Sequence, residues 1–459
     1  MRAKTLRPFC LRDKIGYMFG DVANDFTFLL SSSFMLKFYT DIMGIDAGVV
    51  GLLMTAARFV DAVTDVTMGQ IVDRSKPTKN GKFKPWLLRM CGPVAISSFL
   101  IYQGGLADMS YTFKVIWMVV TYLLWGSIFY TSINIPYGSM SSAISGDAGD
   151  RAQLSTWRTV GGTVAGLLIG VLTPMVAYVV VDGQTVMSAS RMTIIAGVFS
   201  VLAIICYLIS YSLVTERVEV PANTQKLDVV AMLKSLFTNR SLMGIIGSAI
   251  LLLLAQLGTS SMAGYVFPNF YGSAAAQSVA SLAGSLVIIV VCAPLAVPLA
   301  KKFGKKELAT VSCLVAGVAY LVCLVVVPKN PWIYLAFSSA SYVGIGFFNV
   351  LCWAMINDVI DEAELKNGIR EDGTIYSVYS FARKIGQALS SGLVGILLSM
   401  VGYTDATAFD PEVTLGIFKM SCIIPAVGFL AVVLIFVYPL NKAKVEANVQ
   451  ALKARQNKA

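Results

Sequence analysis

Histidine is absent from this chain of 459 residues, and charged residues make up only 14% of it. Without an imidazole there is no histidine proton relay, so proton chemistry falls to carboxylates, lysine or tyrosine. The eight cysteines are scattered singly without metal-ligand spacing, as is typical of small packing side chains. We find no nucleophile with a base, no phosphate loop and no metal cluster. The sequence therefore supports neither an enzyme nor a resident cofactor.

Apolar residues dominate instead, at 56% of the chain, which is too many for a soluble protein of this length. We predict about twelve apolar spans, each long enough to cross a bilayer as a helix. They run approximately over residues 15–40, 46–72, 86–106, 112–144, 153–181, 191–214, 241–270, 277–300, 308–327, 331–357, 373–402 and 412–438. The predicted fold class is an all-α membrane protein.

The loops alternate in charge along the chain. Lysine and arginine gather near the start, after the second and eighth spans, and in the tail, whereas the intervening loops are short and acidic or neutral. By the positive-inside rule both termini are cytoplasmic. The net charge of +10 reflects this asymmetry and does not indicate nucleic-acid binding.

A long polar interruption divides the chain into two halves of six helices each. We predict an N-terminal half at 1–214, a cytoplasmic central loop at 215–240, a C-terminal half at 241–438 and a cytoplasmic tail at 439–459. A basic turn follows the second helix of each half. This organisation favours a duplicated transporter with its site near the midplane, between the halves. The tail is expected to form an amphipathic surface helix, because Val445, Val449 and Leu452 share a face.

Three charged residues lie inside the second span. Arg58, Asp61 and Asp65 follow i, i+3, i+7 spacing and so share one helix face. An ionisable residue at membrane depth costs about 2.5–3.5 kcal/mol on insertion scales, and two acids four residues apart repel each other. The pair therefore predicts a cation site, although an Arg58–Asp61 ion pair that only joins helices remains an alternative.

Further polar and aromatic side chains occur at membrane depth on other spans. The candidates are Asn24, Asp25, Tyr130, Thr131, Asn134, Arg158, Trp353, Tyr379 and Lys384. Aromatic rings there can stack on a sugar, but most membrane aromatics pack cores or interfaces. Three acidic residues lie at membrane depth, namely Asp25, Asp61 and Asp65. Three basic residues lie there as well, namely Arg58, Arg158 and Lys384. This balance predicts a mutually paired cluster.

Several sequence blocks resemble a known family of transporters. They are Lys14-Ile-Gly-Tyr-Met-Phe-Gly-Asp21, Phe38-Tyr-Thr-Asp41, Ala57-Arg-Phe-Val-Asp-Ala-Val-Thr-Asp65, Gly81-Lys-Phe-Lys-Pro-Trp86, Asn134-Ile-Pro-Tyr-Gly138 and Ser377-Val-Tyr-Ser-Phe-Ala-Arg-Lys384. With others, these blocks cover nearly the whole chain and resemble the glycoside–pentoside–hexuronide:cation symporters, which include melibiose permease. The resemblance implies the major facilitator fold, with twelve transmembrane helices in two six-helix halves.

The resemblance also implies residue roles. Cation-binding residues would be Asp61, Asp65, Thr131 and Thr64, with Asp61 and Asp65 as the metal ligands if the cation is sodium. Substrate-binding residues would be Asn24, Asp25, Tyr130, Asn134, Arg158, Trp353, Tyr379 and Lys384, and coupling residues would be Arg58 and Lys384. Asn134, Gly138 and Thr64 depart from the melibiose permease pattern. The first two make an unmodified galactoside pocket doubtful, and the third leaves sodium or proton open.

We therefore expect symport of a sugar with a co-transported Na⁺ or H⁺ and no other cofactor, by a multi-pass monomer in the bacterial inner membrane. The partners would be the sugar, the cation and the lipid bilayer. Two alternatives remain: a transporter of the same fold for a sugar acid or small organic anion, and a non-transporting membrane sensor. An acidic segment from Asp358 to Asp372 could latch onto the basic turn from Arg74 to Lys84, or be simply solvated.

Overall fold

The computed structural model describes residues 7–218, 240–367, 372–431 and 438–456. Contacts between residues divide the chain into two compact units. The N-terminal unit is Met1–Gln225 with Gly402–Ala408, and the C-terminal unit is Lys226–Val401 with Phe409–Ala459.

The N-terminal unit is almost entirely helical. Its elements are α1 (Leu11–Asp41), α2 (Ala47–Arg74), α3 (Lys84–Ile101), η1 (Gly104–Leu106), α4 (Tyr111–Tyr122), η2 (Leu123–Tyr130), α5 (Thr131–Ile144), α6 (Ala148–Ala177), β1 (Tyr178–Val181), β2 (Gln184–Met187) and α7 (Ala189–Leu213). The segment η2 is a π-helix that joins α4 and α5 into one continuous helical span. Such π-helical turns occur often at functional sites.

The C-terminal unit is built in the same way. Its elements are α9 (Arg240–Tyr265), η3 (Val266–Phe270), α10 (Ala274–Leu286), η4 (Val287–Cys292), α11 (Ala293–Phe303), α12 (Lys305–Val326), α13 (Pro331–Asn367), α14 (Asp372–Met400), α15 (Pro411–Ala431) and α16 (Lys442–Gln456). Here α10, η4 and α11 form one span, as do α9 and η3. The helix α16 confirms the helix predicted for the tail.

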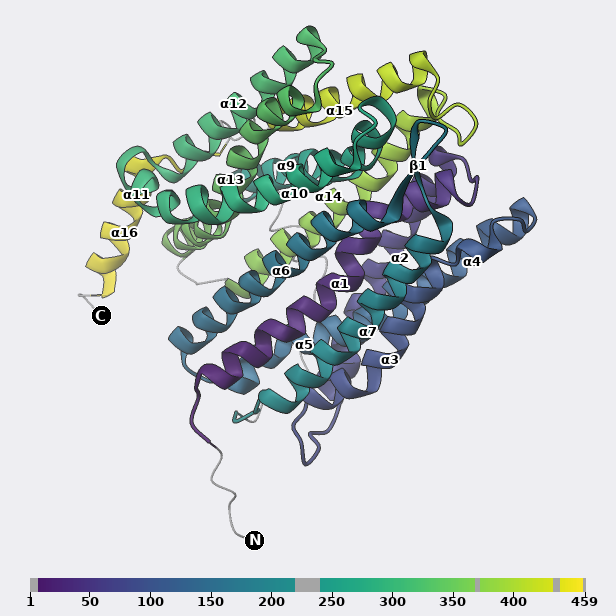
Figure 1. The fold of residues 1–459 in the computed structure, drawn as a ribbon. Helices are drawn as coiled ribbons and strands as arrows, with labels where there is room; N and C mark the ends of the chain where they lie inside the picture. The colour runs from purple at the N-terminus through teal and green to yellow at the C-terminus, as the bar shows by residue number, and fades with distance from the viewer. Residues whose placement is uncertain (1–6, 219–239, 368–371, 432–437, 457–459) are drawn as a thin grey trace. The chain divides into compact units, whose positions relative to one another are not determined.

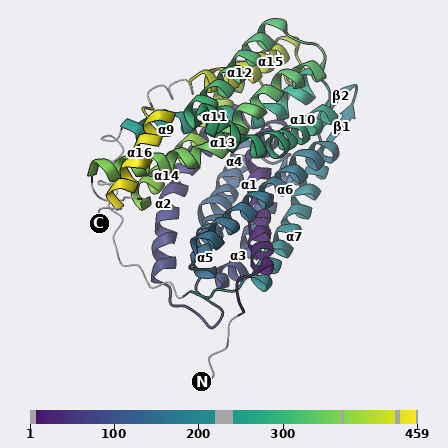
Figure 2. The same cartoon turned by 90° about the vertical axis from the view of Figure 1, so that its left-hand side faces the viewer.

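Within the described ranges, nine helical segments are long and apolar enough to cross a membrane. A shorter apolar segment, Ile385–Met400, belongs to α14, and α1 and α3 complete the twelve predicted spans. One boundary was wrong. The span predicted at 153–181 ends as a helix at Ala177, and residues 178–181 form β1, which pairs with β2 in an antiparallel hairpin (Figure 2). This run of Tyr and Val is equally suited to a strand, so apolarity alone did not distinguish the two.

The helix α1 is the centre of the N-terminal unit, where it lies between α6 and α7 (Figure 1). Four large side chains recur on it at four-residue intervals and are at most 3% exposed. They are Phe26, Leu30, Phe34 and Phe38. This spacing places them on one slowly turning face, which buries α1 and fixes the depth of the polar residues between them. On the other side of the unit, α2 packs against η2 and α5.

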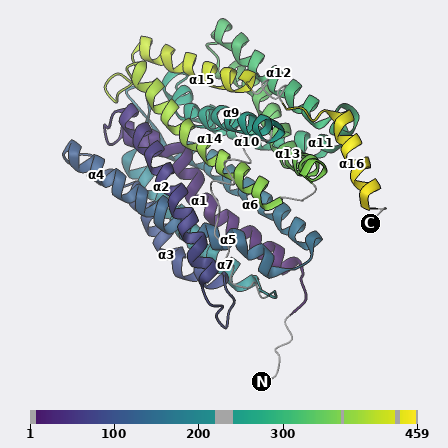
Figure 3. The same ribbon diagram turned by 180° about the vertical axis from the view of Figure 1, so that it is seen from behind.

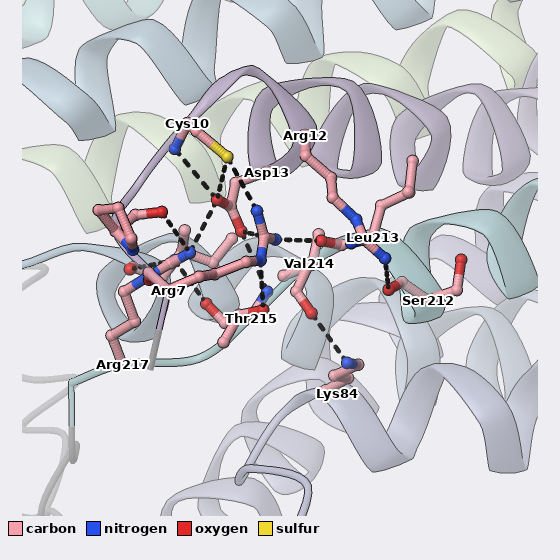
Figure 4. A network of polar contacts seen from close by, with 12 residues as sticks. Arg7, Cys10, Arg12, Asp13, Lys84, Ser212, Leu213, Val214, Thr215 and Arg217 are labelled. Atoms are coloured by element: carbon pink, nitrogen blue, oxygen red, sulfur yellow. Dashed lines mark hydrogen bonds and ion pairs between the residues drawn. The ribbon is translucent and has the colours of Figure 1, made fainter. Parts of the chain in front are cut away.

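A buried carboxylate anchors the first turn of α1 to the end of α7 (Figure 4). Asp13 is fully buried and forms ion pairs with Arg7, at 2.7 Å, and with Arg217, at 2.8 Å. The backbone N–H of Thr215 also donates to Asp13. Nearby, the carboxylate of Glu216 accepts hydrogen bonds from the backbone N–H groups of residues 82, 83 and 84 at the start of α3. These contacts position α1, α3 and α7 together at one end of the unit.

In the C-terminal unit α12 packs against α13 and α15, and α9 packs against α14 and α15 (Figure 3). Two acidic residues near the end of α13 have cationic partners within this unit. Asp358 pairs with Lys305 at 2.7 Å, and Glu362 pairs with Lys366 and Lys444. Asp358 begins the acidic segment for which the sequence analysis gave two interpretations, a latch onto the turn from Arg74 to Lys84 or a solvated loop. Residues 358–367 of this segment belong to α13 and residues 368–371 lie outside the described residues, so the latch stays a prediction.

Candidate cation and substrate sites

Two aspartates of α2 face two hydroxyl groups on the helix opposite. The Ser127 hydroxyl donates to Oδ1 of Asp61 at 2.5 Å, and the Thr131 hydroxyl donates to Oδ1 of Asp65 at 2.9 Å. The two aspartates are four residues apart on α2, and the two hydroxyl residues are four apart across η2 and α5. One helical turn of α2 therefore lies beside one turn of the facing helix. The result is a ladder of two carboxylate–hydroxyl pairs inside the N-terminal unit.

Arg58 supplies positive charge to one step of this ladder. Its Nη1 lies 3.3 Å from Oδ2 of Asp61, and its guanidinium lies 5.3 Å from the centre of the Phe28 ring. The Nε atom of Arg58 is buried and has no hydrogen-bond partner among the described residues. Asp61 is therefore held by a hydroxyl on one oxygen and a guanidinium on the other.

Further neutral oxygens surround the two aspartates. The Thr131 hydroxyl lies 3.1 Å from the carbonyl oxygen of Gly126, within the π-helical turn, and the Thr64 hydroxyl donates to the carbonyl of Asp61 at 3.1 Å. Carboxylate, hydroxyl and carbonyl oxygens are the ligands that hard cations prefer. In the described part of the chain no group of three or more His, Cys, Asp and Glu side chains could hold a metal ion. Hydroxyl or carbonyl oxygens therefore lie beside both carboxylates.

A second acidic pair lies on α1. Arg158 of α6 donates from Nε to Oδ1 of Asp21 at 2.8 Å, and its guanidinium lies over the Tyr137 ring. One turn further along α1, Asp25 makes no hydrogen bond or ion pair within the described ranges. Its Oδ2 lies 2.7 Å from where a Cβ atom at Gly162 would be, so the carboxylate rests against bare backbone of α6.

This arrangement differs from the closed cluster that the sequence predicted. Arg158 was counted as a partner for the deep acids Asp25, Asp61 and Asp65, but it binds Asp21, which the charge count left out. The four-residue step from Asp21 to Asp25 places both carboxylates on the face of α1 toward α6. The hydrogen bond and ion pair of Arg158 are with the first of them.

Asn24 and Asn134 contribute neutral polar groups. The side chain of Asn24 is 1% exposed, and its Oδ1 accepts a hydrogen bond from the Tyr207 hydroxyl at 2.7 Å. Its Nδ2 has no partner in the described structure, which leaves one buried donor open. Asn134 is half-buried on α5 and makes no hydrogen bond with any described residue.

Tyr130 forms an aromatic wall with two neighbours. Its ring stacks on Phe28, with centroids 5.8 Å apart, and tilts against Trp125 at 5.5 Å. Since Phe28 also lies under Arg58, this wall joins the environment of the α2 acids to α1. An aromatic face of this kind can pack on a sugar ring, and it equally well packs a helix interface.

The C-terminal candidates are described only in part. Tyr379 is fully buried in α14, and its hydroxyl accepts a hydrogen bond from Arg383 at 3.4 Å. Trp353 lies on α13 and Lys384 on α14, but their side chains fall outside the described residues. This unit also holds a polar pair that the sequence reasoning missed, in which Asn349 donates to Gln256 at 3.3 Å.

Two N-terminal residues were missed as well. Ser127 precedes Thr131 by the same four residues that separate Asp61 from Asp65, and Asp21 precedes Asp25 by four. That matching interval is a signal that the sequence does contain. It becomes useful only once the helices that face each other are known.

The helical spans and their buried polar groups define a multi-pass membrane transporter. A family model described as "MFS/sugar transport protein" matches residues 16–442, and the chain belongs to this family. It is 31% identical to the uncharacterized symporter YjmB of Bacillus subtilis (strain 168), over 98% of this chain and 96% of that protein. It is 30% identical to the glucuronide carrier protein homolog of Escherichia coli (strain K12), over 97% of this chain and 96% of the relative.

Solved structures agree on the fold. The crystal structure of a D-xylose-proton symporter superposes with a TM-score of 0.66 at 11% sequence identity, over 93% of this chain and 96% of that one. The predicted fold class is therefore confirmed: this is an all-α membrane protein with the major facilitator fold. The predicted resemblance to glycoside–pentoside–hexuronide:cation symporters is confirmed by the family model and the relatives.

Proposed function

We propose that this protein is a secondary active transporter that carries a sugar together with Na⁺ or H⁺ by alternating access. The observation that supports the coupling most directly is the ladder of Asp61 with Ser127 and Asp65 with Thr131. Two carboxylates at membrane depth are expensive unless a positive charge joins them. Arg58 pairs with Asp61 at 3.3 Å and is the countercharge that a bound cation or proton would replace there.

The substrate is a glycoside, pentoside or hexuronide, bound by Asp25 and its polar neighbours. An ionised carboxylate accepts hydrogen bonds from two sugar hydroxyls at once, while the amides of Asn24 and Asn134 donate to sugar oxygens. Tyr130 would support the ring face. Arg158 would hold Asp21 and orient this end of the pocket. No cofactor takes part other than the co-transported cation.

A sugar acid or other small organic anion is the second candidate substrate, and the hexuronide is the member of the first class that shares its negative charge. The glucuronide carrier protein homolog among the relatives favours it, because a hexuronide brings its own carboxylate. In the structure, however, Arg58 and Arg158 each have an aspartate partner. An acidic substrate would therefore compete with Asp61 or Asp21 for a guanidinium, and a neutral sugar would not.

Coupling follows from charge balance in the proposed cycle. Cation binding at Asp61 and Asp65 releases Arg58 and Lys384 from their roles as countercharges, and the freed groups then complete the sugar pocket. States with both ligands, or with neither, leave few charges unpaired and can change access. A state with only one of the two ligands bound leaves more charges unpaired, so its change of access costs more free energy. The sugar would move in the direction of the cation gradient.

Transport in proteoliposomes tests the proposal. Purified protein is reconstituted, and uptake of a panel of radiolabelled neutral sugars and sugar acids is measured with an imposed Na⁺ gradient, an imposed pH gradient, or neither. We expect accumulation of at least one sugar under one of the two gradients, and its loss when that gradient is dissipated. Uptake that is the same with and without either gradient would contradict cation coupling. Ligand binding without counterflow would indicate a sensor that does not transport.

A further inference from the structure

A cavity of about 490 Å³ lies in the C-terminal unit, and none of its lining residues belongs to the candidate sites described above. Residues of α11, α13 and α16 line it. The helix α16 packs against α13 (Figure 3). Its walls are apolar, formed by Val297 and Ala300 of α11, by Val350, Leu351 and Ala354 of α13, and by Leu440. Cavities of this size hold small organic ligands.

The rim of this cavity is positively charged. Lys301, Lys305 and Lys442 line it, against the single acid Glu446. Lys305 is already paired with Asp358, and the Lys442 ammonium donates to the backbone carbonyl of Lys302 at 3.1 Å. Lys301 makes no hydrogen bond or ion pair with any described residue. The rim therefore offers at least one open cation directly above an apolar interior.

The cavity lies at the end of a membrane span. The span Ala274–Phe303 is apolar, and its last turns present Leu295, Val297 and Phe303 outward, each between 44% and 55% exposed. An exposed apolar helix face in a membrane protein contacts lipid tails. The lysines that follow this face mark the boundary at which the tails give way to headgroups.

We propose that this cavity binds one anionic phospholipid from the adjacent leaflet. An acyl chain would run along Val297, Val350 and Leu351, and the phosphate would lie at Lys301 and Lys442. Charge complementarity selects this occupant, since a basic pocket between transmembrane helices at the membrane surface suits an anionic headgroup. With the orientation proposed above, this is the cytoplasmic leaflet. The lipid would join the tail helix α16 to α11 and α13.

Lipid titration of the purified full-length protein, followed by native mass spectrometry, tests this site. We expect phosphatidylglycerol to bind several-fold more tightly than phosphatidylcholine of the same chains. Each of Lys301→Ala and Lys442→Ala should weaken phosphatidylglycerol binding about five-fold, because a lysine at a charged membrane surface contributes on that scale. Ala354→Trp, which fills the cavity, should weaken both lipids.

Lys302→Ala is the matched control. This neighbouring lysine lies over the Phe303 ring at 5.1 Å and does not line the cavity, so its removal should leave the preference unchanged. Equal binding of the two lipids, or an equal loss in the Lys301 and Lys302 variants, would overturn the proposal. Competition by glycerol phosphate as strong as by the phospholipid would assign the rim to a free anion instead. Loss of lipid binding on dimerisation would assign the groove to a second copy.

Discussion

The helices α1 and α2 each carry two aspartates four residues apart, yet the two pairs have different surroundings. On α2, Asp61 and Asp65 each accept a hydrogen bond from a hydroxyl of the facing helix. On α1, Asp21 is paired with Arg158, whereas Asp25 has no partner among the described residues and rests against Gly162. Equal spacing thus produces a ladder in one place and an open carboxylate in the other, and the facing helix decides which.

This difference favours two functions, cation binding at one pair of aspartates and sugar binding at the other. On α2 the carboxylates lie beside hydroxyl oxygens, which are ligands that a hard cation prefers, and Arg58 is the countercharge that such a cation would release. An unpartnered carboxylate at membrane depth is costly, and a ligand with hydroxyl groups relieves that cost. We therefore propose that the cation binds at α2 and the sugar at α1.

The largest effect is expected on α2. Asp61→Asn or Asp65→Asn should abolish cation-driven sugar accumulation, because each variant removes half of the negative charge that faces the cation. Exchange of sugar across the membrane, which needs no net cation movement, should survive. The measurement is accumulation against counterflow in the same proteoliposomes. Either variant accumulating sugar at the wild-type rate would place the cation elsewhere.

The next effect is expected on α1. Asp25→Ala should weaken sugar binding about ten- to hundred-fold, since a charge-assisted hydrogen bond contributes about 1.5–3 kcal/mol. Asp25→Asn should retain part of the affinity, because the amide oxygen still accepts. Calorimetric titration of the purified protein gives the dissociation constants. An unchanged dissociation constant for sugar in Asp25→Ala would show that this carboxylate has a structural role, and α1 would then no longer differ from α2 as the sugar-binding helix.

Lys384 sharpens the comparison by connecting the two tasks. In the proposed cycle its ammonium substitutes for the cation in the empty state, so Lys384→Ala should leave cation binding intact or tighter. The gain in sugar affinity on adding cation should then collapse. We would measure sugar affinity with and without Na⁺, and at high and low pH, in both proteins. A cation-dependent gain equal to that of wild type would exclude Lys384 as the coupling residue.

The fold was predictable because membrane spans are encoded in long apolar runs, which need no knowledge of their neighbours. The partner of Arg158 was not predictable in the same way. Asp21 and Asp25 lie on one face of α1, and the choice between them depends on the depth at which α6 packs. The prediction for the end of the 153–181 span was wrong for a related reason, since a β-branched run is apolar in either conformation.

Ser127 was missed because a hydroxyl on an apolar helix looks ordinary. Serine and threonine in membrane helices commonly bond to their own backbone, as Ser132 does to the carbonyl of Ile128. Only the register of α2 against η2 shows that Ser127 points across to Asp61 instead. Charged residues in a membrane span can be singled out from the sequence, because their burial costs free energy. Neutral ligands such as Ser127 can be identified only from the three-dimensional structure.

Ser127 also provides the smallest of the expected effects and the finest test of the ladder. Ser127→Ala removes one hydrogen bond to Asp61 but no charge, so the apparent cation affinity should fall about two- to ten-fold, in line with 0.5–1.5 kcal/mol. Sugar affinity at saturating cation should stay the same, because Asp25 is untouched. Ser132→Ala is the matched control, since its hydroxyl is used by its own helix. If both variants shift the cation dependence equally, the Ser127–Asp61 contact serves packing alone, and the ladder reduces to the single step between Asp65 and Thr131.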